Sequence, residues 1–89
     1  MRKLDLTSKS QKFLASLPPK QFRQIAAKTF ALMDNPEPPD SQALAGSPYR
    51  RADIGEYRVI YRVEEDILKA PLIGKRNDAE IYRDLPRLT

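Results

Sequence analysis

The sequence contains no cysteine and no histidine, and these two absences narrow the chemistry open to the protein. Without cysteine there is no disulfide framework, no thiolate metal site and no thiol nucleophile. Without histidine the chain lacks the commonest general base and the commonest metal ligand. Any catalysis must therefore rely on arginine, lysine, tyrosine and carboxylate side chains, and we expect neither a metal ion nor another cofactor.

Long apolar segments are also missing. No run approaches the roughly 20 residues that a membrane-spanning helix needs, and Met1–Leu6 lacks the apolar stretch of a signal peptide. We therefore expect a soluble, cytoplasmic protein. A chain of 89 residues has room for one domain, which we predict to span residues 1–89.

The charge is only mildly positive. Lysine and arginine number 16 against 12 acidic residues, which gives a formal net charge of +4. The part of the chain from Tyr49 onward is nearly balanced, so a nucleic-acid-binding role depends on where the cations point and not on bulk charge.

The first part of the chain predicts a strand and a short helix. Arg2–Leu6 alternates between polar and apolar residues, as a strand does. Thr7 or Ser8 can then cap a helix, because a hydroxyl accepts from the free N–H groups at a helix start. Pro18 and Pro19 end this helix, and Pro19 suits the first turn of the next.

The second helix has the clearest periodicity in the sequence. Its apolar stripe recurs at spacings of three and four residues, which is typical of an amphipathic helix. We expect it to end near Asn35, because Pro36 disfavours helical backbone at the preceding residue. The predicted stripe consists of Phe22, Ile25, Ala26, Thr29, Phe30 and Met33.

Residues 35–48 contain half of the eight prolines and are predicted to form a loop. From Tyr49 the period changes to two, which indicates strands over residues 49–54, Tyr57–Val63 and Ile67–Ile73. Gly55 and Glu56 suit the first turn. Pro71 cannot donate to a sheet ladder, so it should lie at a bulge or face an edge.

These elements predict an α+β fold with two layers, in which an αα-hairpin covers one face of a sheet. The sequence does not say where the first strand lies in that sheet. Leu68, Ala70 and Leu72 should share one face, while Tyr57 and Tyr61 should pack in the core. The face away from the helices should be free, and it would carry Arg51, Asp53, Arg58, Ile60 and Arg62.

Two stretches carry a family resemblance. Residues 49–61 (YRRADIGEYRVIY) and 74–83 (GKRNDAEIYR) resemble the central strands and the C-terminal part of the RelE/ParE toxins of type II toxin–antitoxin systems. The resemblance implies the two-layer fold described above, with the N-terminal strand, the helical hairpin and a three-stranded antiparallel meander in one sheet. It also implies a cognate antitoxin as partner, and the stripe of the second helix would be core or antitoxin surface.

The resemblance points to one of two activities. RelE-like members cut mRNA, often on the ribosome, whereas ParE-like members inhibit DNA gyrase. Arg58, Arg76 and Tyr82 match the nuclease pattern and would be catalytic. The further cations expected to bind RNA are Arg50, Arg51, Arg62, Lys75 and Arg83. Lys75 could equally be plain surface.

Asp53 departs from the nuclease pattern. Nuclease members often place a second basic residue at this outward position, and a carboxylate beside a phosphate repels it unless it is paired. Asp53 could pair with Arg58 or Arg62 across the strands, or it could act as a base. The roles of the residues on this strand therefore stay open.

The chemistry of RNA cleavage suits this set of side chains. RNA carries its own nucleophile, the 2′-OH, so an enzyme must align it, stabilise charge on the phosphate and move two protons. Arginine donates two hydrogen bonds to a phosphate and stays charged. Tyr82 could act as a base if cations lower its pKa, or it could stack on a nucleobase.

The sequence therefore predicts a metal-independent endoribonuclease that cleaves mRNA, with the ribosome aligning the message for a weak catalyst. Its partners would be mRNA, the ribosome and an antitoxin. A gyrase inhibitor without enzymatic activity, and an inactive nucleic-acid-binding relic, remain as alternatives, and gyrase is a partner only under the first of these.

Overall fold

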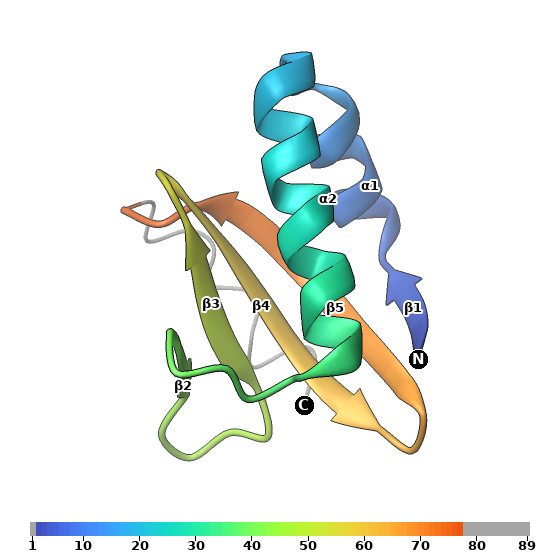
Figure 1. The fold of residues 1–89 in the computed structure, drawn as a ribbon, viewed down its shortest axis with the longest axis vertical. Helices are drawn as coiled ribbons and strands as arrows, with labels where there is room; N and C mark the ends of the chain where they lie inside the picture. The colour runs from blue at the N-terminus through green and yellow to red at the C-terminus, as the bar shows by residue number, and fades with distance from the viewer. Residues whose placement is uncertain (1, 78–89) are drawn as a thin grey trace.

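The structure is a computed structural model that describes residues 2–77, and two helices and five strands lie in this part of the chain (Figure 1). The elements are β1 (Lys3–Leu6), α1 (Ser8–Ala15), α2 (Pro19–Asp34), β2 (Ser41–Ala43), β3 (Arg50–Ile54), β4 (Tyr57–Glu64) and β5 (Ile67–Lys75). The predicted α+β class is confirmed. Neither helix of residues 2–77 is long and apolar enough to cross a membrane.

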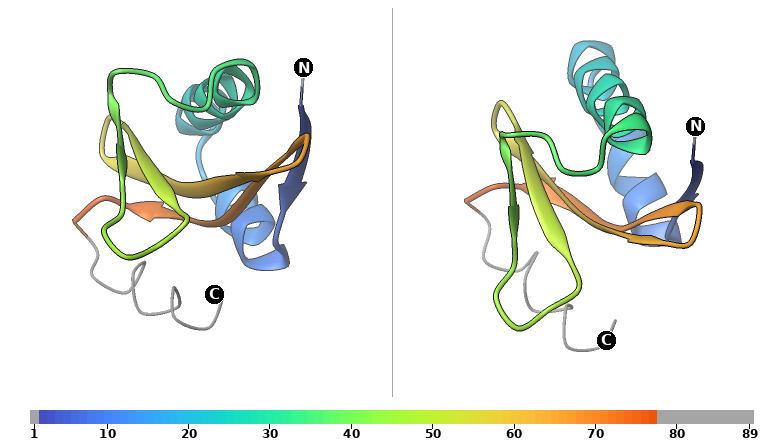
Figure 2. Two further views of the ribbon diagram at one scale, coloured as in Figure 1. Left: turned by 90° about the horizontal axis from the view of Figure 1, so that it is seen from below. Right: turned by 60° about the horizontal axis from the view of Figure 1, so that its bottom comes forward.

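All five strands form one sheet in the order β1-β5-β4-β3-β2. β3, β4 and β5 form the predicted antiparallel meander. β1 pairs in parallel with β5, with Leu4 opposite Leu68, and the chain between these two strands contains both helices and the strands β2, β3 and β4. Both helices cover the same face of the sheet, as Figures 1 and 2 show.

The proline-rich segment contains a short strand that the sequence did not predict. β2 pairs with β3, placing Ser41 opposite Ala52 and Ala43 opposite Arg50. Three residues are too few to show a period, so the prediction of a loop across all of residues 35–48 was wrong at this point. The segment is also tied to the core, because the hydroxyl of Tyr61 donates to the carbonyl of Pro36 at 2.5 Å.

The start of α1 agrees with the prediction. The side chain of Thr7 accepts from the backbone N–H of Ser10 at 3.2 Å and so caps the helix. Two hydroxyls of this turn also reach the sheet: Thr7 donates to the carbonyl of Pro71 at 2.8 Å, and Ser10 donates to that of Ala70 at 2.9 Å. These bonds fix the helix against β5.

α2 begins at Pro19 and ends one residue before Asn35, as predicted, but its apolar stripe divides. Phe22 and Phe30 are 43% and 55% exposed. They lie roughly 60° and 140° around the helix from the buried Ile25, whereas Leu32, which the stripe omitted, lies about 20° away. Phe22 and Phe30 therefore lie outside the core, and the other alternative given for the stripe, an antitoxin surface, stays a prediction for these two residues. The buried residues of α2 are Ile25, Thr29, Leu32 and Met33.

A bulge interrupts the pairing of β4 with β5. Ile60 lies opposite Leu72 but Arg62 lies opposite Lys69, so β5 carries one extra residue, and Pro71 falls there. The prediction that Pro71 sits at a bulge is confirmed. The extra residue shifts the alternation by one position. Leu72 consequently points away from the face that holds Leu68 and Ala70, and its predicted placement with them was wrong.

The core has two parts, one on each face of the sheet. The larger cluster lies under the helices and includes Tyr61, while Tyr57 packs against it, as predicted. The smaller cluster lies on the opposite face, where Tyr49, Ile60 and Leu72 are buried and Leu44 packs against them. The face away from the helices is therefore only partly free, because an apolar patch divides its charged residues.

Candidate nucleic-acid interface

The predicted site residues are distributed over both faces of the sheet. Three of the arginines occupy the face away from the helices: Arg51, Arg58 and Arg62. Arg51 is next to Ala52, which points to the helix-side core, so Arg51 points the other way. Arg58 and Arg62 are each two positions from Ile60, which is buried on the face away from the helices, and so share its face. Arg76 follows β5 in a turn. Tyr82 and Arg83 lie outside the described residues.

Arg50 and Lys75 lie on the helix side. Arg50 shares the face of Ala52, and its guanidinium donates to the hydroxyl of Ser41 at 2.9 Å and approaches Glu37 at 3.7 Å. Lys75 pairs with Tyr57, whose ring packs against the helix-side core, so Lys75 points to that side and is exposed. Neither residue joins the cations of the opposite face, and their RNA-binding role stays a prediction.

Arg58 and Asp53 form a two-point ion pair. They are direct partners in the β3–β4 register, so their side chains leave the sheet side by side. Nε of Arg58 donates to Oδ1 of Asp53 at 2.6 Å, and Nη2 donates to Oδ2 at 3.1 Å. The arginine side chain is only 12% exposed and the aspartate 34%. Of the pairings considered for Asp53, the structure forms the one with Arg58.

Two further arginines surround this pair. Nη1 of Arg51 lies 3.8 Å from Oδ2 of Asp53. The backbone N–H of Arg76 donates to the carbonyl of Glu56 at 2.9 Å, which holds the end of β5 against the β3–β4 turn. The hydrogen bonds from Arg58 lower the pKa of Asp53 most, burial opposes them, and the charges of Arg58, Arg51 and Arg76 lower the pKa further. Asp53 is therefore ionised at neutral pH.

We call Arg51, Asp53, Arg58 and Arg76 the arginine corner. Three positive charges accompany one negative charge, so these four side chains carry a net charge of about +2. A guanidinium donates two parallel hydrogen bonds to a phosphate and stays charged at neutral pH. The arrangement can therefore hold an anion such as a phosphodiester. Among residues 2–77 no group of three or more histidine, cysteine, aspartate or glutamate side chains is arranged to hold a metal ion.

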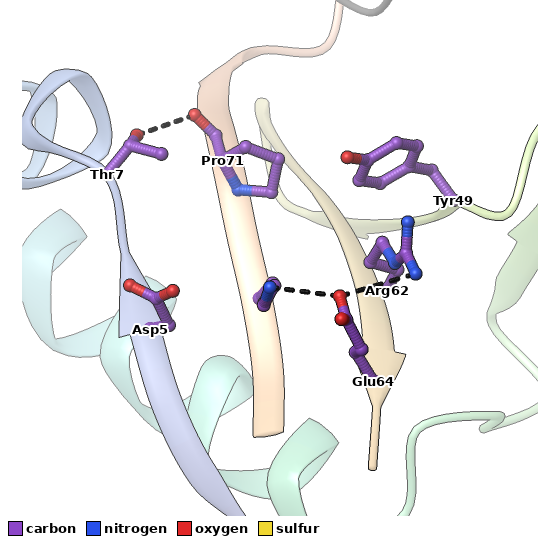
Figure 3. A pocket seen from close by; sticks show the side chains of 7 residues that line it. Asp5, Thr7, Tyr49, Arg62, Glu64 and Pro71 are labelled. Atoms are coloured by element: carbon purple, nitrogen blue, oxygen red, sulfur yellow. Dashed lines mark hydrogen bonds and ion pairs between the residues drawn. The ribbon is translucent and has the colours of Figure 1, made fainter. Parts of the chain in front are cut away.

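Arg62 belongs to a second group. It lies four residues from Arg58, or roughly 13 Å along the strand, with the buried Ile60 between them. Its guanidinium carbon lies 5.7 Å from the centre of the Tyr49 ring, and its Nη2 lies 3.4 Å from Glu64. Figure 3 shows Arg62 between these two residues. Arg62 is thus held by neighbours of its own, away from the arginine corner.

A hollow of about 210 Å³ opens beside Arg62. Lys69 contributes a second cation and lies 2.9 Å from Glu64, which neutralises part of both charges. Sequence reasoning did not single out Tyr49, Lys69 or Glu64. Lys69 lies opposite Arg62 in the β4–β5 pairing, but this register follows the bulge and cannot be counted from the sequence alone. The residues that line the hollow are Asp5, Thr7, Tyr49, Arg62, Glu64, Lys69 and Pro71.

A two-layer α+β domain with both helices on one face of a five-stranded sheet is the fold that the sequence resemblance implies for a RelE/ParE toxin. The family model described as "ParE toxin of type II toxin-antitoxin system, parDE" matches residues 4–80. Because this match covers most of the 89 residues, the chain belongs to the ParE toxin family, within the RelE/ParE superfamily. No curated protein matches the sequence significantly.

Solved structures of RelE toxins share the fold. A doubly substituted Escherichia coli RelE in the free state superposes with a TM-score of 0.84 at 20% identity, over 98% of this chain and 96% of that one. RelE from the RelE–RelB complex of Pyrococcus horikoshii gives 0.76 at 28% identity, over 88% and 98%. The toxin–antitoxin complex RelBE2 of Mycobacterium tuberculosis gives 0.73 at 20% identity, over 84% and 98%.

Proposed function

We propose that this toxin is an endoribonuclease that cleaves mRNA on the ribosome. The arginine corner carries this proposal. It gathers three cations, from β3, from β4 and from the turn after β5, around a single carboxylate on the open face of the sheet. Two of these cations, Arg58 and Arg76, match the nuclease pattern in the sequence.

In the proposed reaction, the 2′-oxygen of RNA attacks the adjacent phosphorus, and the bond from phosphorus to the 5′-oxygen breaks. The products are a 2′,3′-cyclic phosphate and a free 5′-OH. One proton leaves the 2′-OH and one joins the departing 5′-oxygen. Arg58 and Arg76 hold the phosphate and stabilise its developing charge. Tyr82 assists a proton transfer or stacks on a nucleobase.

The ribosome fits a site of this composition. The chain contains no histidine, so no side chain titrates near neutral pH without a strong shift. Such a site is a weak acid–base catalyst, and much of the rate must come from alignment of the 2′-OH with the phosphorus. A ribosome that holds the message in a fixed conformation supplies that alignment. Equal activity on naked RNA and on ribosomes would contradict this part of the proposal.

The proposed partners follow from the same reasoning. Arg51 contacts the RNA backbone beside the cleavage site and Arg62 contacts it farther along the same face, in the cytoplasm where messages are translated, and Arg83 adds a further contact. Arg50 and Lys75 lie on the helix side, so their contacts to RNA fall away from the cleavage site. The RelE proteins of P. horikoshii and M. tuberculosis were each solved in complex with an antitoxin. We infer that this chain also has a cognate antitoxin.

The test is to express the toxin in cells and map new RNA 5′ ends in wild type, Arg76→Ala and Tyr82→Phe. We expect cuts within translated messages that disappear in Arg76→Ala, whereas Tyr82→Phe reports whether the hydroxyl takes part. Arg23→Ala is the matched control, because Arg23 is an exposed arginine on α2, on the helix side of the sheet. Growth arrest without new RNA ends would contradict the proposal.

A second candidate is inhibition of DNA gyrase without catalysis. The match to the ParE family model favours it, and so does Asp53, which already occupies two N–H donors of Arg58. Under this candidate, purified toxin inhibits supercoiling by gyrase, and Tyr82→Phe inhibits as well as wild type. Supercoiling at normal rates, together with the RNA cuts described above, would exclude it.

A further inference from the structure

Asp53 is the carboxylate of the arginine corner, and the proposed reaction assigns it no role. Its charge has the sign of the substrate, yet it lies against the arginine assigned to hold the phosphate. A carboxylate in this position could block the site, act as a base or orient the arginine. The contacts of Asp53 favour the third role.

The contact between Asp53 and Arg58 restricts the orientation of the guanidinium. An arginine side chain is long and has many rotamers, so an unsupported guanidinium meets a phosphate in many orientations. Asp53 contacts Nε and Nη2 together, at 2.6 and 3.1 Å, and these two donors lie on one edge of the planar group. This contact fixes the plane of the guanidinium as well as its position. It uses two of the five N–H donors of Arg58.

Asp53 and Arg58 are also held in place by burial and by their paired positions on two strands. The Arg58 side chain is the more buried of the two, with 12% of its surface exposed, while Asp53 is 34% exposed. Both project from neighbouring strands at directly paired positions, which rigid backbone holds in register. Sites on strands keep their geometry better than sites on loops. The pair is therefore preformed before any RNA arrives.

The charge of Asp53 is balanced by the arginines around it. Asp53 interacts with Arg58, Arg51 and Arg76, so its negative charge is more than matched by its neighbours. The corner keeps an excess of positive charge for the phosphate. Removing the carboxylate would raise that excess and strengthen the attraction for RNA. It would also release Arg58 from its fixed orientation.

We propose that Asp53 is a positioning residue that holds the guanidinium of Arg58 in the orientation needed at the scissile phosphate. This inference rests on the proposed ribonuclease function. It predicts that RNA binding and the cleavage rate respond in opposite directions to loss of the carboxylate. A blocking carboxylate, or one that only stabilises the fold, does not produce that split.

The experiment measures cleavage of mRNA on programmed ribosomes at increasing toxin concentration, which separates the maximal rate from the half-saturating concentration. Asp53→Asn should lower the maximal rate by about tenfold or more, which corresponds to at least one 1.36 kcal/mol step in the barrier. Its half-saturating concentration should fall, because the corner then attracts RNA more strongly. Asp53→Glu, which keeps the charge, should recover part of the rate.

Two comparisons make the result specific. In an Arg58→Ala background, Asp53→Asn should have no further effect on the rate, because the two residues act as one unit. Asp66→Asn is the control, since Asp66 is an exposed carboxylate in the turn between β4 and β5, at the other end of these strands from the arginine corner, and should leave the rate unchanged. Denaturant unfolding of each variant shows that the fold is retained.

Each outcome bears on the inference. A faster rate together with tighter binding in Asp53→Asn would show a blocking carboxylate and overturn the proposal, as would an unchanged rate. Additive losses in the double variant would overturn it too, because Asp53 would then act independently of Arg58. If the wild-type toxin cuts no message at all, the proposed ribonuclease function itself fails.

Discussion

The hydroxyl of Thr7 donates to the carbonyl of Pro71 at 2.8 Å while it accepts from the backbone N–H of Ser10 at 3.2 Å. One side chain thus caps α1 and joins this helix to the bulge in β5. The contact spans 64 positions of the sequence and fixes the helical layer beside the strand that leads to the arginine corner.

Thr7→Val should therefore destabilise the protein. The valine has nearly the same shape but loses both the cap and the bond to Pro71, so we expect a loss of about 1–2 kcal/mol in the free energy of unfolding. Urea denaturation measures this value. Ser8→Ala, at the neighbouring exposed hydroxyl, is the control and should cost less. Equal effects of the two substitutions would contradict the assignment of Thr7 as the cap.

Tyr61→Phe tests the link between the core and the proline-rich segment. The ring of Tyr61 is fully buried and its hydroxyl donates to the carbonyl of Pro36. Removing the hydroxyl should cost about 1 kcal/mol, because the carbonyl loses its donor. Tyr57→Phe is the matched control on the same strand and should cost less. The measurement is again the free energy of unfolding, and no change in Tyr61→Phe would contradict the role of this bond.

Leu72→Ala tests the apolar cluster on the face away from the helices. Leu72 is 3% exposed beside Ile60 and Tyr49, so the truncation should cost about 2–4 kcal/mol. Val63, which is 36% exposed, provides the comparison, and Val63→Ala should cost about 0.5 kcal/mol. Thermal or urea unfolding distinguishes the two. A small loss for Leu72→Ala would mean that this face contributes little to stability.

The Asp53–Arg58 pair predicts a loss of stability in acid. The pKa of Asp53 in the folded protein is lowered from its ordinary value of 3.8, first by the hydrogen bonds from Arg58. The ionised carboxylate therefore stabilises the fold at pH values above 3.8, and this contribution disappears as the pH falls through the lowered pKa. The stability difference between wild type and Asp53→Asn should thus be largest near neutral pH and should shrink in acid. A difference independent of pH would contradict the pair.

Much of the fold was predictable because its signals are local. Thr7, Pro19 and Pro36 mark helix boundaries through their own hydrogen bonding or backbone restriction, and each acts within a few residues. Gly55 adopts a φ of 57°, the conformation that its turn requires. The alternation of β4 correctly assigned Tyr57 and Tyr61 to the helix-side core.

The candidate site was predictable only in part. The sequence identified Arg58, Arg76 and Asp53 and named Arg51 among the cations. It did not predict which arginine is the partner of Asp53. That contact depends on which residue of β4 lies opposite Asp53, and the β3–β4 register decides this. Lys69 and Tyr49 beside Arg62 were missed for a similar reason, since Lys69 comes from β5 and Tyr49 from the segment just before β3.

The sequence by itself determined the helices, the meander and the set of charged residues available for chemistry, because capping, backbone restriction and periodicity act between near neighbours. Only the tertiary structure decided that β1 pairs with β5, that the bulge at Pro71 turns Leu72 to the other face, and that Asp53 holds Arg58. The pairing of β1 with β5 depends on contact between distant segments, which is set by the packing of the whole chain. The bulge and the Asp53–Arg58 contact depend on the registers of the β4–β5 and β3–β4 hairpins, which the alternation of residues along a single strand does not encode.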